Sequence, residues 1–206
     1  MKVLLVNGSP NEYGCTHTAL CEVAKTLEAN GVETELLYLG KKPLAGCIDC
    51  EQCGGAGHCV FDDVVNKISA RMDEFDGIVA GSPVYYAGPS SQICGFLDRL
   101  FYCNESAVAG KVGACVVSCR RGGASAAFDR LNKYFTISRM VVASSQYWNQ
   151  VHGFTPEDVR KDEEGLQTMR TLGTNIAWLL KSIESGRKAG IPAPQYEKTI
   201  YTHFIR

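Results

Sequence analysis

The feature that most constrains the fold is an alternation of short apolar runs with longer amphipathic segments. The first run, Val3 to Val6, contains no polar residue and leads into the turn formers Asn7 to Pro10. An unbroken apolar run of this length predicts a strand that is buried on both faces of a parallel sheet. From Thr18 onward the apolar residues recur at helical spacing, and Asn30-Gly31 predicts the end of that helix.

The same alternation continues along the chain. Further strands are expected at 33–39, 77–81, 111–118 and 140–143, and helices over 62–72, 93–101 and 124–135. A last helical pattern extends from Leu166 to Ile183, Gly186 ends it, and residues 195–206 form an arm. Strands that alternate with helices predict right-handed crossovers and a parallel sheet covered on both faces. We therefore expect a doubly wound α/β fold with the flavodoxin-like five-strand order 2-1-3-4-5.

We expect one domain over residues 1–206, with a core of about 1–145 and a C-terminal helix and arm over 146–206. The chain carries 21 Lys and Arg against 22 Asp and Glu, whereas a nucleic-acid partner would require a basic face. Its apolar runs are far shorter than the ~20 residues that span a bilayer. The N-terminal apolar run is also too short for a signal peptide. These observations predict a cytoplasmic protein without a membrane or nucleic-acid partner.

In such a sheet, ligands bind beyond the carboxyl ends of the strands, where the strand order reverses between strands 1 and 3. The first loop at this place, 7–18, has three hydroxyls and two glycines but no Lys or Arg. Backbone N–H groups at a helix start can hold a phosphate without a cationic side chain. The loop has neither a P-loop motif nor a dinucleotide-binding glycine motif. A Ser/Thr-rich helix cap is the alternative interpretation.

The loops 82–91 and 118–125 are predicted to lie at the same edge. Tyr85 and Tyr86 stand among prolines and glycines and could form a wall for a planar ligand, or could cover the next helix. Arg120 and Arg121 precede two glycines, which permit close backbone approach, although solvated arginines in a tight turn explain them equally. One phosphate, a polar chain and a flat ring together fit flavin mononucleotide (FMN).

Four of the ten cysteines, Cys47, Cys50, Cys53 and Cys59, fall within thirteen residues. The C-x2-C-x2-C spacing is typical of ferredoxins, and the fourth cysteine would complete the ligand set of a [4Fe-4S] cluster. Zinc is the second interpretation, although zinc sites usually pair two C-x2-C units across a longer loop. Free thiols are the third. The remaining cysteines are scattered and are interpreted as small apolar residues.

Three motifs, Gly8-Ser9-Pro10 with Gly14-Cys15-Thr16, Gly81 to Tyr85, and Ser118 to Gly123, resemble those of the NADPH-dependent FMN reductases and iron-sulfur flavoproteins of the flavodoxin superfamily. The resemblance covers roughly residues 1–145. It implies FMN, and it implies the same four cysteines as cluster ligands. The cofactor-binding residues that we predict are Ser9, Pro10, Cys15, Thr16, His17, Thr18, Pro83, Val84, Tyr85, Tyr86, Gly88, Ser118, Arg120, Arg121, Gly122 and Gly123.

The leading hypothesis is an FMN-dependent oxidoreductase. It would take hydride from NAD(P)H and pass electrons to a quinone, a flavin or a metal, directly or through the cluster. No side chain is assigned as catalytic, because flavin N5 carries the chemistry. The alternatives are a ferredoxin-linked electron-transfer protein, a redox carrier or sensor without turnover, and a zinc-bearing interaction protein. Apolar residues beyond a minimal five-stranded domain, Trp148 and Trp178 among them, predict a homodimer or homotetramer.

Overall fold

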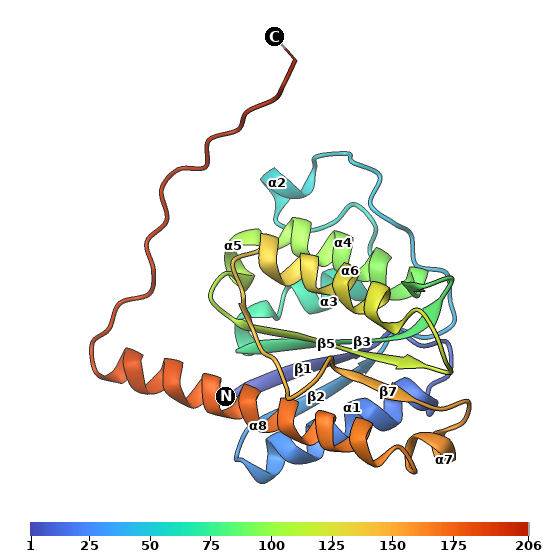
Figure 1. The fold of residues 1–206 in the computed structure, drawn as a ribbon. Helices are drawn as coiled ribbons and strands as arrows, with labels where there is room; N and C mark the ends of the chain where they lie inside the picture. Colours follow the sequence, from blue (N-terminus) through green and yellow to red (C-terminus); the bar gives the residue numbers. More distant parts are fainter. Residues whose placement is uncertain (206) are drawn as a thin grey trace.

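The computed structural model describes residues 1–205. Its central sheet is parallel and has the strand order β2-β1-β3-β5-β6, which confirms the predicted doubly wound topology (Figure 1). The structure adds two short strands to the five expected, since β4 pairs with β3 and β7 pairs with β5. The strands along the main path are β1 (Lys2–Asn7), β2 (Glu33–Tyr38), β3 (Gly77–Tyr85), β5 (Val112–Cys119) and β6 (Val141–Val142).

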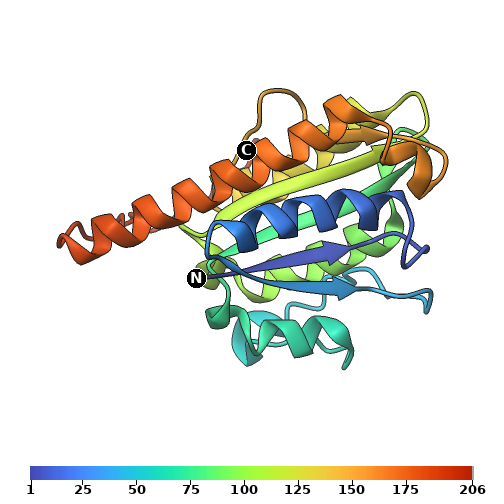
Figure 2. The same ribbon diagram turned by 90° about the horizontal axis from the view of Figure 1, so that it is seen from below.

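Helices cover both faces of this sheet (Figure 2). One hydrophobic cluster joins the sheet to α1 (Cys15–Ala29) and α8 (Glu163–Lys188). A second cluster joins the other face to α3 (Val64–Ser69), α4 (Ser91–Cys103) and α6 (Ala124–Ile137). Short elements complete the fold: α2 (Cys53–Ala56), a 3₁₀ turn at Met72–Glu74, α5 (Glu105–Val108) and α7 (Pro156–Val159). Within residues 1–205 no helix is long and apolar enough to cross a bilayer.

Several element boundaries differ from the predicted ones. The first helix begins at Cys15, three residues before Thr18. The expected helix over 62–72 ends at Ser69 and is followed by the separate 3₁₀ turn. Strand β3 continues past Gly81 to Tyr85 and turns back into β4 (Gly88–Pro89). Its extension matters for the site, because it carries the two tyrosines beyond the end of β1.

The fifth position of the sheet is shared by two strands. The expected strand at 140–143 is reduced to β6, which pairs with the start of β5. Strand β7 (Gln150–His152) pairs in parallel with the end of β5, and Val151 is fully buried. Helix α8 contributes buried residues to the α1 cluster as far as Leu180. Beyond the helix the chain turns and continues as an extended arm along one side of the molecule (Figure 1).

Candidate functional site

The carboxyl ends of β1, β3 and β5 bring the three predicted loops into contact. The Gly8 amide donates to the Gly81 carbonyl at 2.9 Å, and the Ser90 hydroxyl donates to the Gly8 carbonyl at 2.6 Å. These bonds join the first loop to the second. The hydroxyls of Thr16 and Ser118 lie 2.8 Å apart and are buried, so a hydrogen bond joins the first loop to the third.

The first loop has the construction of an anion cradle. Its backbone is fixed by side chains: the Ser9 amide donates to Asn7 Oδ1 at 3.0 Å, and the Asn11 amide donates to Ser9 Oγ at 3.1 Å. Helix α1 starts directly after it, and the residue before the helix, Gly14, supplies no side-chain cap. The amides of the first turn, including those of Thr16 and His17, have no carbonyl partner within the helix. Such donors fit a phosphate group.

The second loop is a tight turn that exposes its aromatic side chains. Tyr85 pairs with Gly88, so Tyr86 and Ala87 form the two-residue turn of a β-hairpin. Both have left-handed backbone angles, with φ of 49° and 59°, which is the geometry of a type I′ turn. The Tyr86 side chain is fully exposed and Tyr85 is half exposed. Tyr86 therefore covers no helix, and both tyrosines present exposed ring surface at this edge of the sheet.

The third loop lies against this turn. Gly123 has a φ of 90°, and a Cβ atom built on it would lie 2.8 Å from the Cα atom of Ala87 and 3.1 Å from Val84 Cγ1. Only glycine permits this approach together with that backbone angle. Arg120, Arg121 and Gly122 form the rim, and the two arginines are exposed. The Cys119 thiol donates to the Gly122 carbonyl at 3.0 Å, which fixes the start of the loop.

Two of the predicted cofactor-binding side chains contact protein groups. The Cys15 thiol is 3.8 Å from the Gly153 carbonyl, and burial raises its pKa. The His17 ring packs edge-on against Tyr13 at a centroid distance of 5.2 Å, and partial burial lowers its pKa. The lowered pKa disfavours a positive charge on the His17 ring next to the cradle.

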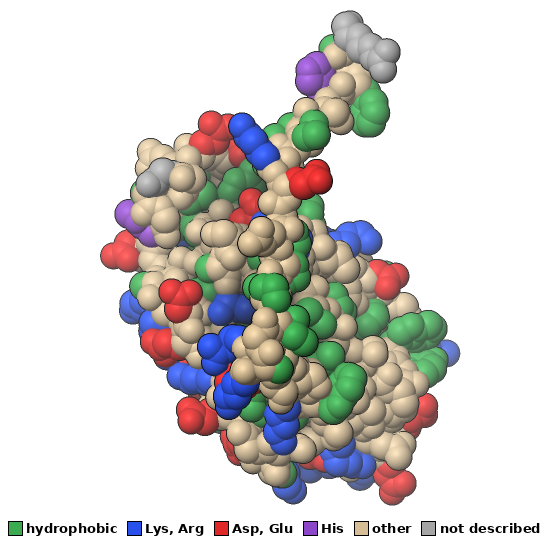
Figure 3. All heavy atoms as spheres, turned by 90° about the vertical axis from the view of Figure 1, so that its left-hand side faces the viewer, with side chains coloured by type: hydrophobic (Ala, Val, Ile, Leu, Met, Phe, Trp, Pro, Cys, Tyr) green, Lys and Arg blue, Asp and Glu red, His purple; other side chains and the backbone are tan. Residues whose placement is uncertain are grey.

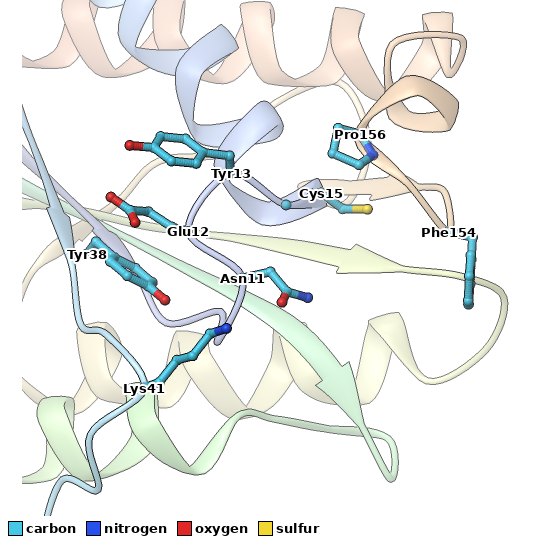
Figure 4. Close-up of a pocket in the computed structure, with 9 residues that line it drawn as sticks. Asn11, Glu12, Tyr13, Cys15, Tyr38, Lys41, Phe154 and Pro156 are labelled. Carbon is cyan, nitrogen blue, oxygen red and sulfur yellow. The ribbon is translucent and has the colours of Figure 1, made fainter.

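A hollow of about 380 Å³ opens beside the first loop and includes residues that the sequence analysis missed (Figure 4). Lys41 follows β2 and extends toward the loop that carries Asn11, so it brings a cation to a loop that has none (Figure 4). Because Lys41 follows the carboxyl end of a parallel strand, topology could have predicted its place. A fourth loop, after β7, was not predicted and contributes Phe154 and Pro156. The other lining residues are Glu12, Tyr13, Gly14, Cys15 and Tyr38.

The cysteine-rich segment lies over α4, on the face opposite α1 and α8 (Figure 1). Cys47, Cys50, Cys53 and Cys59 all line one small hollow. Thiols are the ligands that iron-sulfur clusters use, so the donor set fits such a group. Within residues 1–205, however, no three Cys, His, Asp or Glu side chains converge closely enough to hold a single metal ion. The structure thus gathers the four thiols without forming a compact metal cage.

Three residues of α4 also line this hollow, namely Arg99, Tyr102 and Cys103, and the sequence predicts none of them there. Cys103 lies beside Cys53, and burial together with that neighbouring thiol raises the pKa of Cys103 to about 12. Its isolated position along the chain predicts a small apolar residue, whereas the structure places it among the predicted ligands. Arg99 is buried under the segment and donates to the Cys59 sulfur at 3.1 Å. No local sequence motif marks any of the three residues.

Comparison with known proteins gives a consistent result. The family model for NADPH-dependent FMN reductase matches residues 1–155. An iron-sulfur flavoprotein of Methanocaldococcus jannaschii is 34% identical over 192 residues, which cover 89% of this chain and 100% of that protein. An iron-sulfur flavoprotein of Methanosarcina thermophila is 26% identical over 191 residues, which cover 91% of this chain and 99% of that protein.

Solved structures show the same fold at low sequence identity. RosB with its bound intermediate 8-demethyl-8-formylriboflavin-5'-phosphate matches with a TM-score of 0.66 at 14% identity, over 99% of this chain and 92% of that one. A flavodoxin from the domain Archaea matches with a TM-score of 0.61 at 18% identity, over 88% of this chain and 99% of that one. Both likenesses establish the flavodoxin-like fold.

Proposed function

The chain belongs to the NADPH-dependent FMN reductase family, which gives it a flavin-based redox role, and we propose that it is an FMN-dependent oxidoreductase supplied with hydride by NAD(P)H. The observation that carries this proposal is the contact of three loops at the point where the strand order reverses. When bound, FMN supplies the chemistry, because its ring accepts a hydride and releases electrons to an acceptor. The protein's part is to bind and orient it.

In this proposal the first loop holds the phosphate. The amides of Thr16 and His17 point out of the start of α1, and the dipole of that helix favours an anion there. Ser9 and Thr18 flank the amides, while Lys41 adds the one cationic side chain that lines this hollow among the described residues. The buried hydroxyl pair described above fixes the cradle relative to β5.

The remaining loops hold the ring. Pro83 to Tyr86 and Gly88 would lie along one side of it, and Ser118 with Arg120 to Gly123 would border another edge. The strained turn at Tyr86 and Ala87 is fixed in place by its hairpin pairing and by Gly123. Left-handed backbone angles at residues other than glycine cost energy and are concentrated at binding sites. The turn is therefore built to hold the tyrosines outward.

We also propose that Cys47, Cys50, Cys53 and Cys59 hold a [4Fe-4S] cluster. The four thiols line one hollow, and the relatives described above are named iron-sulfur flavoproteins. With a cluster bound, electrons would leave one at a time. The second candidate function follows from this: a ferredoxin-linked electron-transfer protein that exchanges electrons with a protein partner instead of turning over a small acceptor.

Steady-state oxidation of NADH and NADPH by the FMN-loaded protein tests the reductase proposal. The assay is run under anaerobic conditions with a quinone, free flavin and a ferric chelate as acceptors. The proposal predicts turnover with at least one of them. If no acceptor gives turnover while reduced ferredoxin bleaches the flavin absorbance, the electron-transfer function replaces the reductase.

We further propose that the chain assembles at least as a dimer. Trp178 and Ile183 are exposed on α8, and Tyr201 and Phe204 are exposed on the arm. Figure 3 shows hydrophobic side chains along the arm and on the body behind it. Exposed apolar surface of this kind is typical of interfaces. Light scattering after size exclusion would contradict the proposal if it gave only the 22.4 kDa monomer.

A further inference from the structure

We propose that Arg99 is a positioning residue for the cysteine hollow: it fixes the Cys59 sulfur through an N–H···S hydrogen bond and raises the reduction potential of the bound cluster. The inference rests on the proposed cluster and names a residue outside its ligand set. Arg99 lies on α4, forty residues along the chain from Cys59, and it has 1% of its surface exposed.

All the donors of this guanidinium are directed at Cys59 and at residues that flank the cysteine-rich segment on either side, Ala45, Phe61 and Asp63. Nε donates to Cys59 Sγ at 3.1 Å. Nη1 donates to the Ala45 carbonyl at 3.2 Å and to Asp63 Oδ2 at 2.7 Å. Nη2 donates to the Phe61 carbonyl and to Asp63 Oδ1, both at 3.0 Å. A guanidinium has five N–H groups, and all five are used, so its orientation is fixed.

The bond to sulfur is not needed to hold the backbone at Cys59. Asn66 already does this, because its Oδ1 accepts from the Cys59 amide at 2.8 Å and its Nδ2 donates to the Cys59 carbonyl at 2.9 Å. Arg99 therefore acts on the side chain of Cys59. A buried cation has a high desolvation cost unless it is paired. Asp63 pairs it bidentately, and one N–H remains directed at the sulfur.

A hydrogen bond and a positive charge at a ligand sulfur favour the more negative, reduced form of a cluster. Both are among the factors that set the reduction potential of iron-sulfur sites. The carboxylate of Asp63 opposes the charge of Arg99 but leaves its N–H donor in place. Replacing Arg99 and replacing Asp63 should therefore shift the reduction potential in opposite directions. If the substitutions only loosened the segment, the two shifts would not have opposite signs.

The test compares Arg99→Gln, Arg99→Lys and Asp63→Asn after anaerobic reconstitution with iron and sulfide. Asn still caps α3, where the Asp63 side chain accepts from the Val65 amide. The matched control is Arg71→Gln. Arg71 also binds a carboxylate bidentately, at 2.9 and 2.8 Å from Glu35, and lies 5.4 Å from an aromatic ring centroid, but it does not line the cysteine hollow.

The readout is the midpoint potential, followed by electron paramagnetic resonance during a redox titration. Arg99→Gln should lower the midpoint potential. At a fixed potential the ratio of oxidised to reduced cluster should rise about tenfold, which corresponds to ~59 mV for a one-electron couple. Arg99→Lys keeps the charge and should shift less. Asp63→Asn should shift the potential upward, and Arg71→Gln should leave it unchanged.

Unchanged potentials in both Arg99 variants, or a downward shift in Asp63→Asn, would overturn the inference and leave Arg99 as an anchor of the segment. If Arg99→Gln does not fold, the lysine and Asp63 variants still decide the sign. A wild-type protein that takes up no cluster would instead refute the proposed cluster, and with it this role of Arg99.

Discussion

Two neighbouring glycines provide a matched test of the loop contacts that build the site. A Cβ atom on Gly123 would lie 2.8 Å from the Ala87 Cα atom, and the φ of Gly123 is 90°. A Cβ atom on Gly122 would meet nothing within 4 Å, and its backbone angle is not in the left-handed region. Gly123→Ala should therefore be damaging, and Gly122→Ala should be tolerated.

The magnitude follows from two terms. A residue other than glycine in a sparsely populated region of the backbone map costs about 1–3 kcal/mol. Overpacking against atoms that cannot move away costs about another 1–3 kcal/mol. The nearest atom to Gly123 is backbone on a turn that is itself strained, so relief by side-chain rotation is not available. We expect a loss of about 3 kcal/mol, or ~6–12 °C in melting temperature for a chain of this size.

The assay is thermal unfolding of both variants without flavin, followed by fluorescence titration with FMN. Gly123→Ala should melt at the lower temperature and bind FMN at least about tenfold more weakly, which corresponds to ~1.4 kcal/mol, because the turn that carries the tyrosines is displaced. Melting temperatures of the two variants within ~1 °C of each other, with equal FMN affinity, would refute the contact between the second and third loops.

Three further predictions concern the buried hydroxyl pair, the ion pair of Glu35 and the cysteine hollow. Thr16→Val leaves a buried hydroxyl partner on the third loop unsatisfied and should lower the unfolding free energy by about 1–3 kcal/mol and weaken FMN binding, measured by urea unfolding and titration. The Arg71 guanidinium, together with the Lys2 ammonium, lowers the pKa of Glu35 from 4.5 to about 2. The stabilisation from this ion pair is therefore present above the unfolded-state pKa and is lost as the pH falls from 4.5 toward 2. The melting-temperature gap between wild type and Glu35→Gln should accordingly close over that range, and a gap independent of pH would contradict the assignment. Cys59→Ser should lose iron on reconstitution while Cys103→Ser keeps about four irons per chain, and the reverse result would move the fourth ligand to α4.

Much of the fold could be predicted because burial on both faces leaves a plain signal in the sequence. Val3 to Val6 and 111–118 are almost continuously apolar, and both form central strands. The split fifth position carries no such signal. Val141 and Val142 are exposed, and β7 has one buried residue between two half-buried polar ones. The place of β7 in the sheet is decided by its pairing with β5, and the hydrophobic periodicity of so short a segment cannot predict that pairing.

The candidate site divides in the same way. Residues at the carboxyl end of a strand or directly after it, such as Ser118 and Ser9, could be predicted because topology alone places them together. Residues that reach the site through tertiary packing could not. Arg99 and Cys103 lie on α4, and the apolar spacing of that helix predicts only a helix packed on the core. Their partners lie 36 to 54 residues away along the chain. The loop after β7 was missed because the strand before it was not recognised.

In the proposal, the three joined loops bind FMN and the four motif cysteines hold a cluster. The most direct measurement is an anaerobic visible spectrum of the freshly purified chain, with FMN, iron and sulfide quantified per chain. We expect flavin bands at about one FMN per chain, together with about four irons and four sulfides. A colourless protein that neither retains nor binds FMN on titration would refute the flavin site, and flavin without iron after anaerobic reconstitution would refute the cluster.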